Sequence, residues 1–378
     1  MAARVFTDEQ LIEALETMTN AQAAKHFGVW TRTIEVRRAK LARKGWSPEH
    51  DMVKTVPDGF HLKGTSTLYD RFGEQKLQWV KTSIDHERQA ELMRDAVEAL
   101  CQDIPRVKPV KAVGEFDEML AVGYPIGDPH FGEYIWGAEA GGDWDLAIAK
   151  QMHIDAMSAL VGHTPRAEQA VIVNLGDAMH YDSLMPKTPR SGHILNADGR
   201  YPKMIDVLIE TLAVMIDLAL TRHKKVHVIN VQGNHDEAGA HWLPRVLSAR
   251  YLNEPRVTFD MSPRLFNYFR FKKVLVGSHH GHSAKMQALP GIMAADMPQD
   301  WGETLHRYWW TGHVHHESVK EFPGVLCESF NTLAPADPYA FNAGYRSRQT
   351  MKAIVLHGEH GEVGRHMVNP YMLKGAAA

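Results

Sequence analysis

The spacing of apolar residues divides the chain into two regions of different character. Near the amino terminus, apolar side chains recur three and four positions apart, as at Leu11, Ile12 and Leu15, which is the period of an amphipathic helix. We therefore predict three short helices, over residues 7–16, 21–27 and from 30 or 31 to about 44. From Met119 onward, short apolar runs typical of buried strands alternate with longer helical stretches.

The alternating region predicts an α/β fold. Helical stretches over residues 143–161, 204–221 and 240–252 are each long enough to cover a sheet. Strand-like runs become frequent later, at 256–259, 265–271, 274–277 and 351–356. Alternation followed by strands is typical of two packed sheets with helices on the outside, and we expect this fold over residues 112–378.

Residues 49–111 connect the two regions. Two strand-like runs, 60–69 and 75–82, flank Asp70-Arg71-Phe72-Gly73, a hairpin signal with glycine at its tip. The hairpin is predicted to be either a wing of the amino-terminal helices or a ribbon packed against the larger region. A helix over 85–103 and a linker over 104–111 complete the segment. The expected domains are therefore 1–48, 49–111 and 112–378.

The amino-terminal helices match the packing needs of a helix-turn-helix. Gly28 supplies the turn between the second and third helices, and Ala24 and Ile34 provide their contact. Seven Lys or Arg residues and one acid lie within residues 25–44, a balance typical of phosphate contact. We expect DNA to be contacted by Arg32, Arg37, Arg38, Lys40 and Lys44. The alternative is a solvated helical hairpin that only packs on the rest of the protein.

Composition limits the class of protein. Hydrophobic residues make up 44% of the 378 residues and the net charge is −3, as in ordinary globular proteins. No apolar run reaches the length of about 18 residues that a membrane span needs, and the amino terminus lacks a signal-peptide core. With only Cys101 and Cys327, the chain has no disulfide framework and no cysteine-based metal motif. We expect a cytoplasmic protein without membrane attachment.

Short polar clusters follow five of the strand-like runs. The run from Ala170 to Leu175, for example, leads through a glycine to Asp177, which places a carboxylate at the end of a buried strand. The five clusters are Asp128-Pro129-His130, Gly176-Asp177-Ala178-Met179-His180-Tyr181-Asp182, Gly233-Asn234-His235-Asp236-Glu237, His279-His280-Gly281-His282 and Gly312-His313-Val314-His315. Strand ends at one edge of a sheet converge and are where α/β proteins place their sites. We therefore predict one site made from all five loops.

The residue types in these clusters favour divalent metal ions. Carboxylates, an amide oxygen and neutral imidazoles bind manganese, iron, zinc or cobalt, and no thiolate lies near them to form a closed structural zinc site. Two such ions about 3.5 to 4 Å apart can clamp the attacking and leaving oxygens of a phosphate ester and generate hydroxide near neutral pH. The pattern predicts hydrolytic chemistry, with Asp177 as the ligand that both ions share.

In this order, Asp-x-His, Gly-Asp, Gly-Asn-His-Asp, His-Gly-His and Gly-His-x-His resemble the motifs of the calcineurin-like metallophosphoesterase superfamily, over about Leu120 to Leu356. The resemblance implies a β-sandwich flanked by helices. Gly-Asp-x-x-His, ending at His180, is similar to the branch of DNA double-strand-break repair nucleases, whereas the Asp-Arg-Gly sequence of Ser/Thr protein phosphatases is missing. The chain departs from that branch in two places. The proline after this histidine comes only at Pro186, and 63 residues follow His315, where the branch carries a separate DNA-capping region.

The resemblance also implies a role for each residue. One metal ion would be held by Asp128, His130, Asp177 and His315, and the other by Asp177, Asn234, His280 and His313. His279 and His282 are the alternatives to His280. His235 would stand beside the metals as general acid or transition-state stabiliser, with Asp236 to orient it, and His180 would lie near the scissile phosphate. Manganese is the expected ion, with iron, zinc and cobalt as alternatives.

These predictions favour a metal-dependent phosphodiesterase, an exonuclease or endonuclease that acts on DNA held by its amino-terminal module. One alternative keeps the chemistry but acts on a small diester or a phosphate monoester. Another is a DNA-binding regulator with a non-catalytic phosphoesterase domain, although an idle site has no physical need for a full set of matched ligands. A helix-turn-helix joined to a lone phosphoesterase domain would suit a phage or prophage protein. The oligomeric state stays open, with a homodimer as one alternative.

Overall fold

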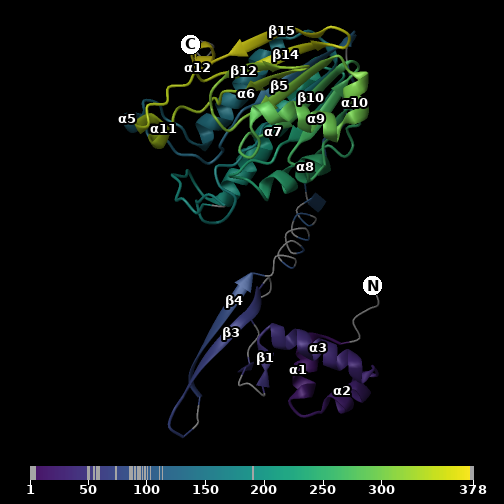
Figure 1. The fold of residues 1–378 in the computed structure, drawn as a ribbon, viewed down its shortest axis with the longest axis vertical. Coiled ribbons are helices and arrows are strands. Elements are labelled where there is room, and N and C mark those ends of the chain that lie inside the picture. Colours follow the sequence, from purple (N-terminus) through teal and green to yellow (C-terminus); the bar gives the residue numbers. More distant parts are fainter. Residues whose placement is uncertain are drawn as a thin grey trace. The chain divides into compact units, whose positions relative to one another are not determined.

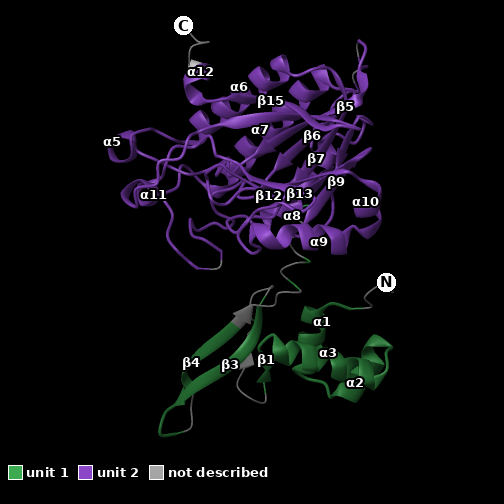
Figure 2. Cartoon of the chain, turned by 45° about the horizontal axis from the view of Figure 1, so that its top comes forward, with its two compact units in different colours: residues 1–99 green, residues 100–378 purple. Residues whose placement is uncertain are grey.

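The computed structural model describes residues 6–48, 52–53, 56, 60–72, 75–84, 88, 91, 95, 97, 99, 101–102, 104–109, 111–112, 114–189 and 191–374. The chain divides into two compact units, Met1–Ala99 and Leu100–Ala378 (Figure 2). Most of the helix predicted over 85–103 lies outside the described residues. Within those described ranges, no helix combines the length and the apolar character that crossing a membrane requires.

The first unit begins with three short helices around a small core (Figure 1). They are α1 (Asp8–Leu15), α2 (Asn20–Phe27) and α3 (Thr31–Arg43). Thr7 and Thr19 cap α1 and α2 through capping boxes, and Gly28 ends α2 in the left-handed conformation, with φ of 65°. The buried side chains between the helices include Leu11, Ala23, Ala24, Ile34 and Leu41. The three predicted helices and the glycine turn are confirmed.

Four strands follow these helices in the same unit. Strands β1 (Trp46–Ser47) and β2 (Met52–Val53) pair antiparallel, as do the longer β3 (Phe60–Tyr69) and β4 (Gln75–Ile84). In the turn of the longer hairpin, Asp70 accepts a hydrogen bond from the backbone N–H of Phe72 at 2.8 Å. The predicted hairpin is therefore present, and its Gly73 lies outside the described residues.

The second unit is built on two mixed sheets. The larger has the order β15-β14-β5-β6-β7-β8, in which β5 to β8 are parallel, β14 is antiparallel to β5, and the edge strand β15 is antiparallel to β14. The smaller has the order β12-β13-β11-β10-β9, in which the three central strands are parallel and both edge strands antiparallel.

The strands of the larger sheet are β5 (Asp117–Ile126), β6 (Ala167–Asn174), β7 (Lys225–Asn230), β8 (Val257–Phe259), β14 (Met351–His357) and β15 (Gly361–Val368). Those of the smaller sheet are β9 (Asn267–Phe271), β10 (Val274–His279), β11 (His306–Thr311), β12 (Ser318–Phe322) and β13 (Val325–Ser329).

The two sheets pack face to face over one apolar core. Val171 and Ile229 of the larger sheet share this core with Val276 and Trp310 of the smaller one. Gly123 in β5 allows the closest approach, because a Cβ atom there would lie 2.2 Å from the ring of Trp310. The arrangement is the two-layered sandwich that the residue pattern predicts.

Helices cover the outer faces of both sheets (Figure 1). On the larger sheet lie α6 (Leu146–His163), α7 (Tyr201–Arg222) and α8 (Gly239–Arg250), which follow β5, β6 and β7. On the smaller sheet, Leu289 and Met293 pack with the β11 residue Trp309. The shorter helices are α5 (Gly137–Ala140), a 3₁₀ turn η2 (Met286–Ala288), α9 (Leu289–Asp296), α10 (Pro298–Glu303), α11 (Pro338–Asn342) and α12 (Pro370–Lys374). The predicted α/β fold, with two sheets flanked by helices, is confirmed.

Candidate metal centre

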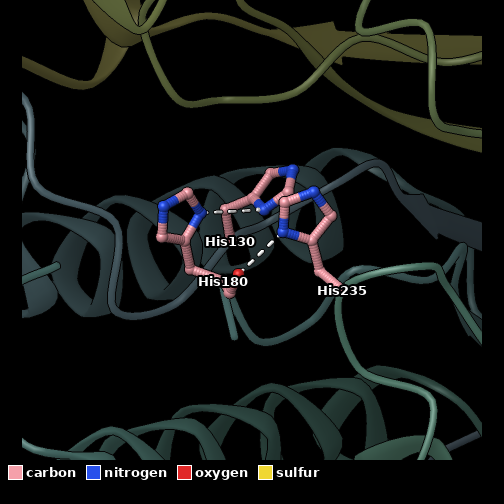
Figure 3. A group of neighbouring side chains, drawn as sticks. All are labelled: His130, His180 and His235. Atoms are coloured by element: carbon pink, nitrogen blue, oxygen red, sulfur yellow. Dashed lines mark hydrogen bonds between the residues drawn. The ribbon is translucent and has the colours of Figure 1, made fainter. Parts of the chain in front are cut away.

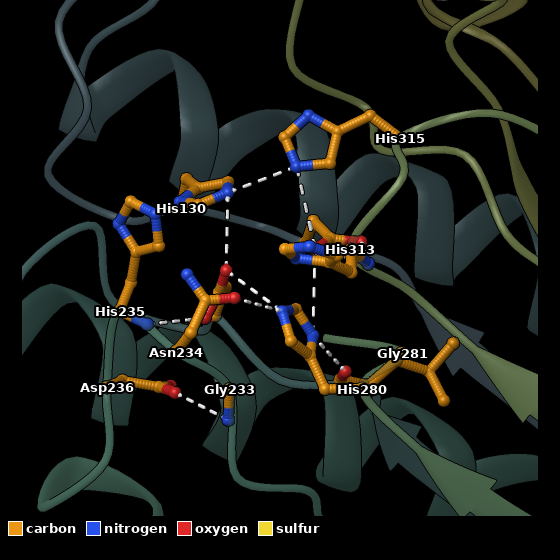
Figure 4. Close-up of polar contacts among 12 residues, drawn as sticks. His130, Gly233, Asn234, His235, Asp236, His280, Gly281, His313 and His315 are labelled. Atoms are coloured by element: carbon orange, nitrogen blue, oxygen red, sulfur yellow. Dashed lines mark hydrogen bonds and ion pairs between the residues drawn. The ribbon is translucent and has the colours of Figure 1, made fainter. Parts of the chain in front are cut away.

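The five predicted clusters follow five parallel strands directly. Asp128, Asp177 and Asn234 come after β5, β6 and β7 of the larger sheet. His280 and His313 come after β10 and β11 of the smaller one. Because the sheets pack face to face, these strand ends meet, and Figure 4 shows the side chains of Asn234, His280 and His313 pointing toward one another.

Two groups of ligand-type side chains form where the loops meet. In the first, Asp128, His130 and His315 offer atoms that all lie within 4.8 Å of one another. The Nε2 atoms of its two histidines are 3.2 Å apart. In the second group, Asp177, His280 and His313 meet the same distance limit. Asn234 joins this group, with Oδ1 at 3.0 Å from Nε2 of His280.

Asp177 lies between the two groups. Its Oδ2 is 3.1 Å from Nε2 of His280 and 4.0 Å from Nε2 of His130. Its Oδ1 accepts a hydrogen bond from the backbone N–H of His235 at 2.8 Å, which fixes the carboxylate. One carboxylate shared by two ligand groups is consistent with a site for two metal ions.

The backbone at this centre is held in an uncommon conformation. Within the described part of the chain, six non-glycine residues have φ between 41° and 69°. Five of these are ligands expected from the sequence: Asp128, His130, Asp177, His313 and His315. Such positions cost energy in non-glycine residues and persist where the surrounding structure imposes them, commonly at functional sites.

Two motif glycines leave room for the carboxylates. A Cβ atom on Gly233 would lie 2.0 Å from Oδ1 of Asp177, and one on Gly312 would lie 2.6 Å from Oδ2 of Asp128. Any side chain at either position would displace a carboxylate. The glycines of Gly-Asn-His and Gly-His-x-His are therefore a steric requirement of the site.

The charges at the centre suit divalent cations. Asp128 and Asp177 are buried, with exposed fractions of 0% and 2%, and a buried carboxylate needs a positive partner. Burial lowers the pKa of His280, but the charge of Asp177 outweighs it and raises this pKa to about 9. The pKa of Asp177 is in turn held well below its ordinary value, despite burial, by His280. Protonated imidazole thus supplies the positive charge that metal ions would bring, so the donor set fits them.

The ring of His280 is also oriented for metal binding. Its Nδ1 donates to the carbonyl oxygen of Leu175 at 2.8 Å, which turns Nε2 toward Asp177 and Asn234, where it can serve as a ligand atom once its proton is displaced. The neighbouring His279 faces elsewhere, because it stacks on Phe266 at 4.6 Å and its Nε2 lies 3.0 Å from Oγ of Ser283. Of the three histidines that the sequence offers here, His279, His280 and His282, it is His280 that lies in the ligand group.

His180 and His235 lie beside the first group (Figure 3). Nδ1 of His180 is 3.3 Å from Nδ1 of His130, and the rings of His180 and His235 stack at 5.6 Å. Burial lowers the pKa of His180 to about 3, so this imidazole is neutral near pH 7. The nitrogen atoms of all three histidines lie within 4.8 Å of one another. His180 and His235 therefore lie next to His130, one of the expected metal ligands, in a group that does not include Asp177.

The structure changes the part expected of Asp236. Its carboxylate accepts hydrogen bonds from the backbone N–H groups of Gly233 at 3.0 Å and Ala178 at 2.8 Å. The His235 ring is instead oriented by a backbone group, since its Nδ1 donates to the carbonyl oxygen of His180 at 2.7 Å. Asp236 therefore ties two ligand loops together. The sequence gives no signal for this because both of its partners are backbone groups.

The basic residues of α3, together with Lys44 at its carboxyl-terminal cap, separate into two sets. Arg37 donates to the carbonyl oxygen of Phe6 at 2.9 Å and pairs with Asp8, and Arg38 donates to Oδ1 of Asn20 at 3.2 Å. Lys44 also reaches Asp8, at 3.4 Å. These three side chains make contacts inside the module.

Arg32 and Lys40 form the other set, and both are exposed. Arg43 is exposed as well. It lies eleven residues after Arg32 and three residues after Lys40, which places it on the same face of α3. Arg43 is not among the residues expected from the sequence to contact DNA, although the helical period alone places it beside Arg32 and Lys40.

No protein-family model matches the sequence, and no curated protein sequence matches it either. Solved structures with a similar fold include a predicted phosphoesterase from Streptococcus pneumoniae, at 11% identity, covering 67% of this chain and 99% of that one, with a TM-score of 0.28. Vps29 from Entamoeba histolytica, solved with zinc, is 14% identical over 65% of this chain and 98% of its own, with a TM-score of 0.27. Vps29 from Cryptosporidium parvum is 13% identical over 66% and 98%, with a TM-score of 0.29. At these identities, the side chains of the site carry the assignment of function.

Proposed function

We propose that this chain is a metal-dependent phosphodiesterase that hydrolyses DNA. The observation that carries the proposal is Asp177, a buried carboxylate whose Oδ2 lies 3.1 Å from His280 and 4.0 Å from His130, between two groups of ligand-type side chains. A shared carboxylate between such groups suits two divalent ions, of which manganese is our first choice.

The site residues would have two kinds of role, metal ligand and proton donor. Asp128, His130, Asp177 and His315 would hold one ion, and Asp177, Asn234, His280 and His313 the other. When bound, the ions would supply Lewis-acid charge to the phosphate and lower the pKa of water. The Nδ1 of His235 is engaged with the carbonyl oxygen of His180, so Nε2 remains to give a proton to the leaving oxygen. His180, neutral and adjacent, would contact the phosphate.

DNA is our choice of substrate because of the exposed face of α3. Arg32, Lys40 and Arg43 lie on one side of a helix that has the position of a recognition helix in a helix-turn-helix. Three cations on one exposed face favour a polyanion over a small phosphate ester.

The test is hydrolysis by the full-length protein after metal removal and readdition of manganese. Single- and double-stranded DNA are compared with bis-p-nitrophenyl phosphate. Cleavage of DNA that depends on manganese supports the proposal. Turnover of the small diester without cleavage of DNA would instead indicate a phosphodiesterase that acts on small substrates. Absence of turnover with every substrate would favour a DNA-binding regulator with a non-catalytic site.

A further inference from the structure

A small pocket in the second unit has a lining unlike that of the metal centre. Its walls are the side chains of Tyr134, Trp136, Glu139, Asn196 and Pro338, around a volume of about 260 Å³. Tyr134 is 46% exposed and Trp136 is 59% exposed, although aromatic side chains of this size are usually well covered. None of the expected metal ligands lines the pocket.

The pocket is tied to the metal centre through a short stretch of chain. His130 and Tyr134 are four residues apart, so their Cα atoms are at most about 14 Å apart. The stretch is fixed at both ends. The backbone N–H of Glu133 donates to the carbonyl oxygen of His130 at 3.0 Å, and that of Tyr134 donates to the carbonyl oxygen of Asn196 at 3.1 Å. The pocket is therefore close enough to the centre for one ligand to place a phosphate at the centre and another group in the pocket.

The two aromatic side chains are exposed because the stretch alternates like a strand. Glu133 and Ile135 are buried, whereas Tyr134 and Trp136 face outward. Ile135 pairs with Trp144, which anchors the buried side of the stretch. The aromatic pair is thus held on a fixed backbone with about half of its surface open to solvent.

The lining selects a flat, uncharged group with polar edges. Aromatic faces stack on planar rings, and the amide of Asn196 and the carboxylate of Glu139 can bond to their polar edges. None of the described Lys or Arg residues lines the pocket, so a phosphate is not favoured there. The volume is below the range of roughly 300 to 1,000 Å³ of pockets for drug-sized ligands. It suits a single ring system.

We propose that this pocket binds the nucleobase of the nucleotide whose phosphate lies at the metal centre. The inference rests on the proposed function and deepens it, because it assigns the substrate as a nucleotide unit and names Tyr134 and Trp136 as the residues that stack on the base. Stacking of this kind tolerates all bases, since every base has an aromatic face. The pocket therefore distinguishes nucleotides from other phosphate esters but does not select one base over another.

The test compares two oligonucleotides on the full-length, manganese-loaded protein. They are identical except that one has abasic tetrahydrofuran units at the cleaved positions. The wild type is expected to favour the base-bearing strand by about fivefold to a hundredfold in kcat/KM, the range of one lost stacking contact. Trp136→Ala should reduce this preference through a higher KM, and Trp136→Phe should retain most of it. Tyr371→Ala, at a tyrosine that is 86% exposed on α12 and outside the pocket, is the control and should behave like the wild type.

Binding of deoxyadenosine monophosphate, measured by calorimetry, separates the possible failures. Weaker binding to Trp136→Ala than to the wild type supports the pocket even if no DNA is cleaved, and it would then indicate a free nucleotide as the ligand. Cleavage of DNA by the wild type with equal rates for both strands would overturn the pocket and leave the proposed function standing. Equal nucleotide affinity in the wild type and Trp136→Ala would overturn it as well.

Discussion

Asp177 can occupy its place between the two ligand groups because Gly233 has no side chain, since a Cβ atom there would lie 2.0 Å from Oδ1 of Asp177 and 2.3 Å from its backbone nitrogen. The glycine in Gly-Asn-His is thus part of the site, although it holds no metal itself. Displacing the shared carboxylate would affect both ligand groups at once.

Gly233→Ala is therefore expected to lower turnover by about 10²-fold or more, the effect of a displacement of about 1 Å at a reacting centre. Metal content measured on the purified protein should fall below two equivalents. Gly162→Ala is the matched control, because nothing lies within 4 Å of its Cβ position in α6. That variant should keep full activity and gain up to about 1 kcal/mol in stability. Full activity of Gly233→Ala would show that the carboxylate can move without loss.

Asp177→Asn tests the shared ligand directly. Replacing the carboxylate removes a charge that faces both His130 and His280, so occupancy of both metal positions should fall together. Hydrolysis should be lost. Elemental analysis of the purified variant measures the number of bound metal ions per chain. Two full equivalents with normal turnover would rule out Asp177 as the shared ligand.

His235→Asn should behave differently from Asp177→Asn. If His235 gives a proton and holds no metal, metal content stays at the wild-type level while kcat falls by about 10² to 10⁴, the usual contribution of a positioned acid. The two quantities are measured on the same sample. Loss of a metal equivalent in this variant would make His235 a ligand, in the histidine group that it forms with His130 and His180.

The meeting of the candidate ligands at one place could be predicted from the sequence because each lies just after a strand, and strand ends depend on local information. Asp177 follows a buried strand and a glycine, and the ends of parallel strands meet at one edge. The contacts of Arg37, in contrast, could not be predicted from local sequence. As a cation on a helix it is indistinguishable in sequence from Arg32, but the fold sets it against Phe6 and Asp8. That contact joins residues about thirty positions apart, which no local pattern reports.

The hydrogen bonds of Asp236 and the exposure of Tyr134 and Trp136 could not be predicted from the sequence for the same reason. Asp236 bonds to backbone groups of its own loop and of the Asp177 loop, so its partners depend on how two loops meet. Tyr134 and Trp136 would be expected in the core from their residue types, and only the burial of Glu133 and Ile135 places them outside. Strand ends are encoded locally, whereas loop-to-loop contacts arise from the tertiary fold.

Metal binding should become tighter as the pH rises from 6.5 to 9. In the metal-free protein the pKa of His280 is raised to about 9, mainly because Asp177 opposes the effect of burial. The charged imidazole stabilises the metal-free fold fully below pH 6.5, and this contribution is lost as the pH rises through 9. Metal must displace that proton, so at pH 7 affinity should be roughly 100-fold below its value with neutral His280.

Calorimetric titration of manganese in buffers of different ionisation enthalpy counts the protons released. His280 should contribute about one proton at pH 7 and about half a proton at pH 9. A binding enthalpy at pH 7 that does not depend on the buffer would contradict this account. It would show that His280 is already neutral when the metal arrives.

The two sets of basic residues on α3 should respond differently to substitution. Arg32, Lys40 and Arg43 are exposed on one face, and replacing all three with Gln should weaken DNA binding without affecting the fold or the turnover of a small diester. If each contacts a phosphate, the slope of log K against log salt should become shallower by about 0.9 per residue. Arg37→Gln is the matched control within the same helix. It removes the ion pair to Asp8 and the contact with the carbonyl oxygen of Phe6, so it should lower the melting temperature of the amino-terminal module while leaving the three exposed cations in place. An unchanged salt slope in the triple variant would make the module a structural appendage, because counterion release must follow the loss of phosphate contacts wherever a helix face binds a duplex.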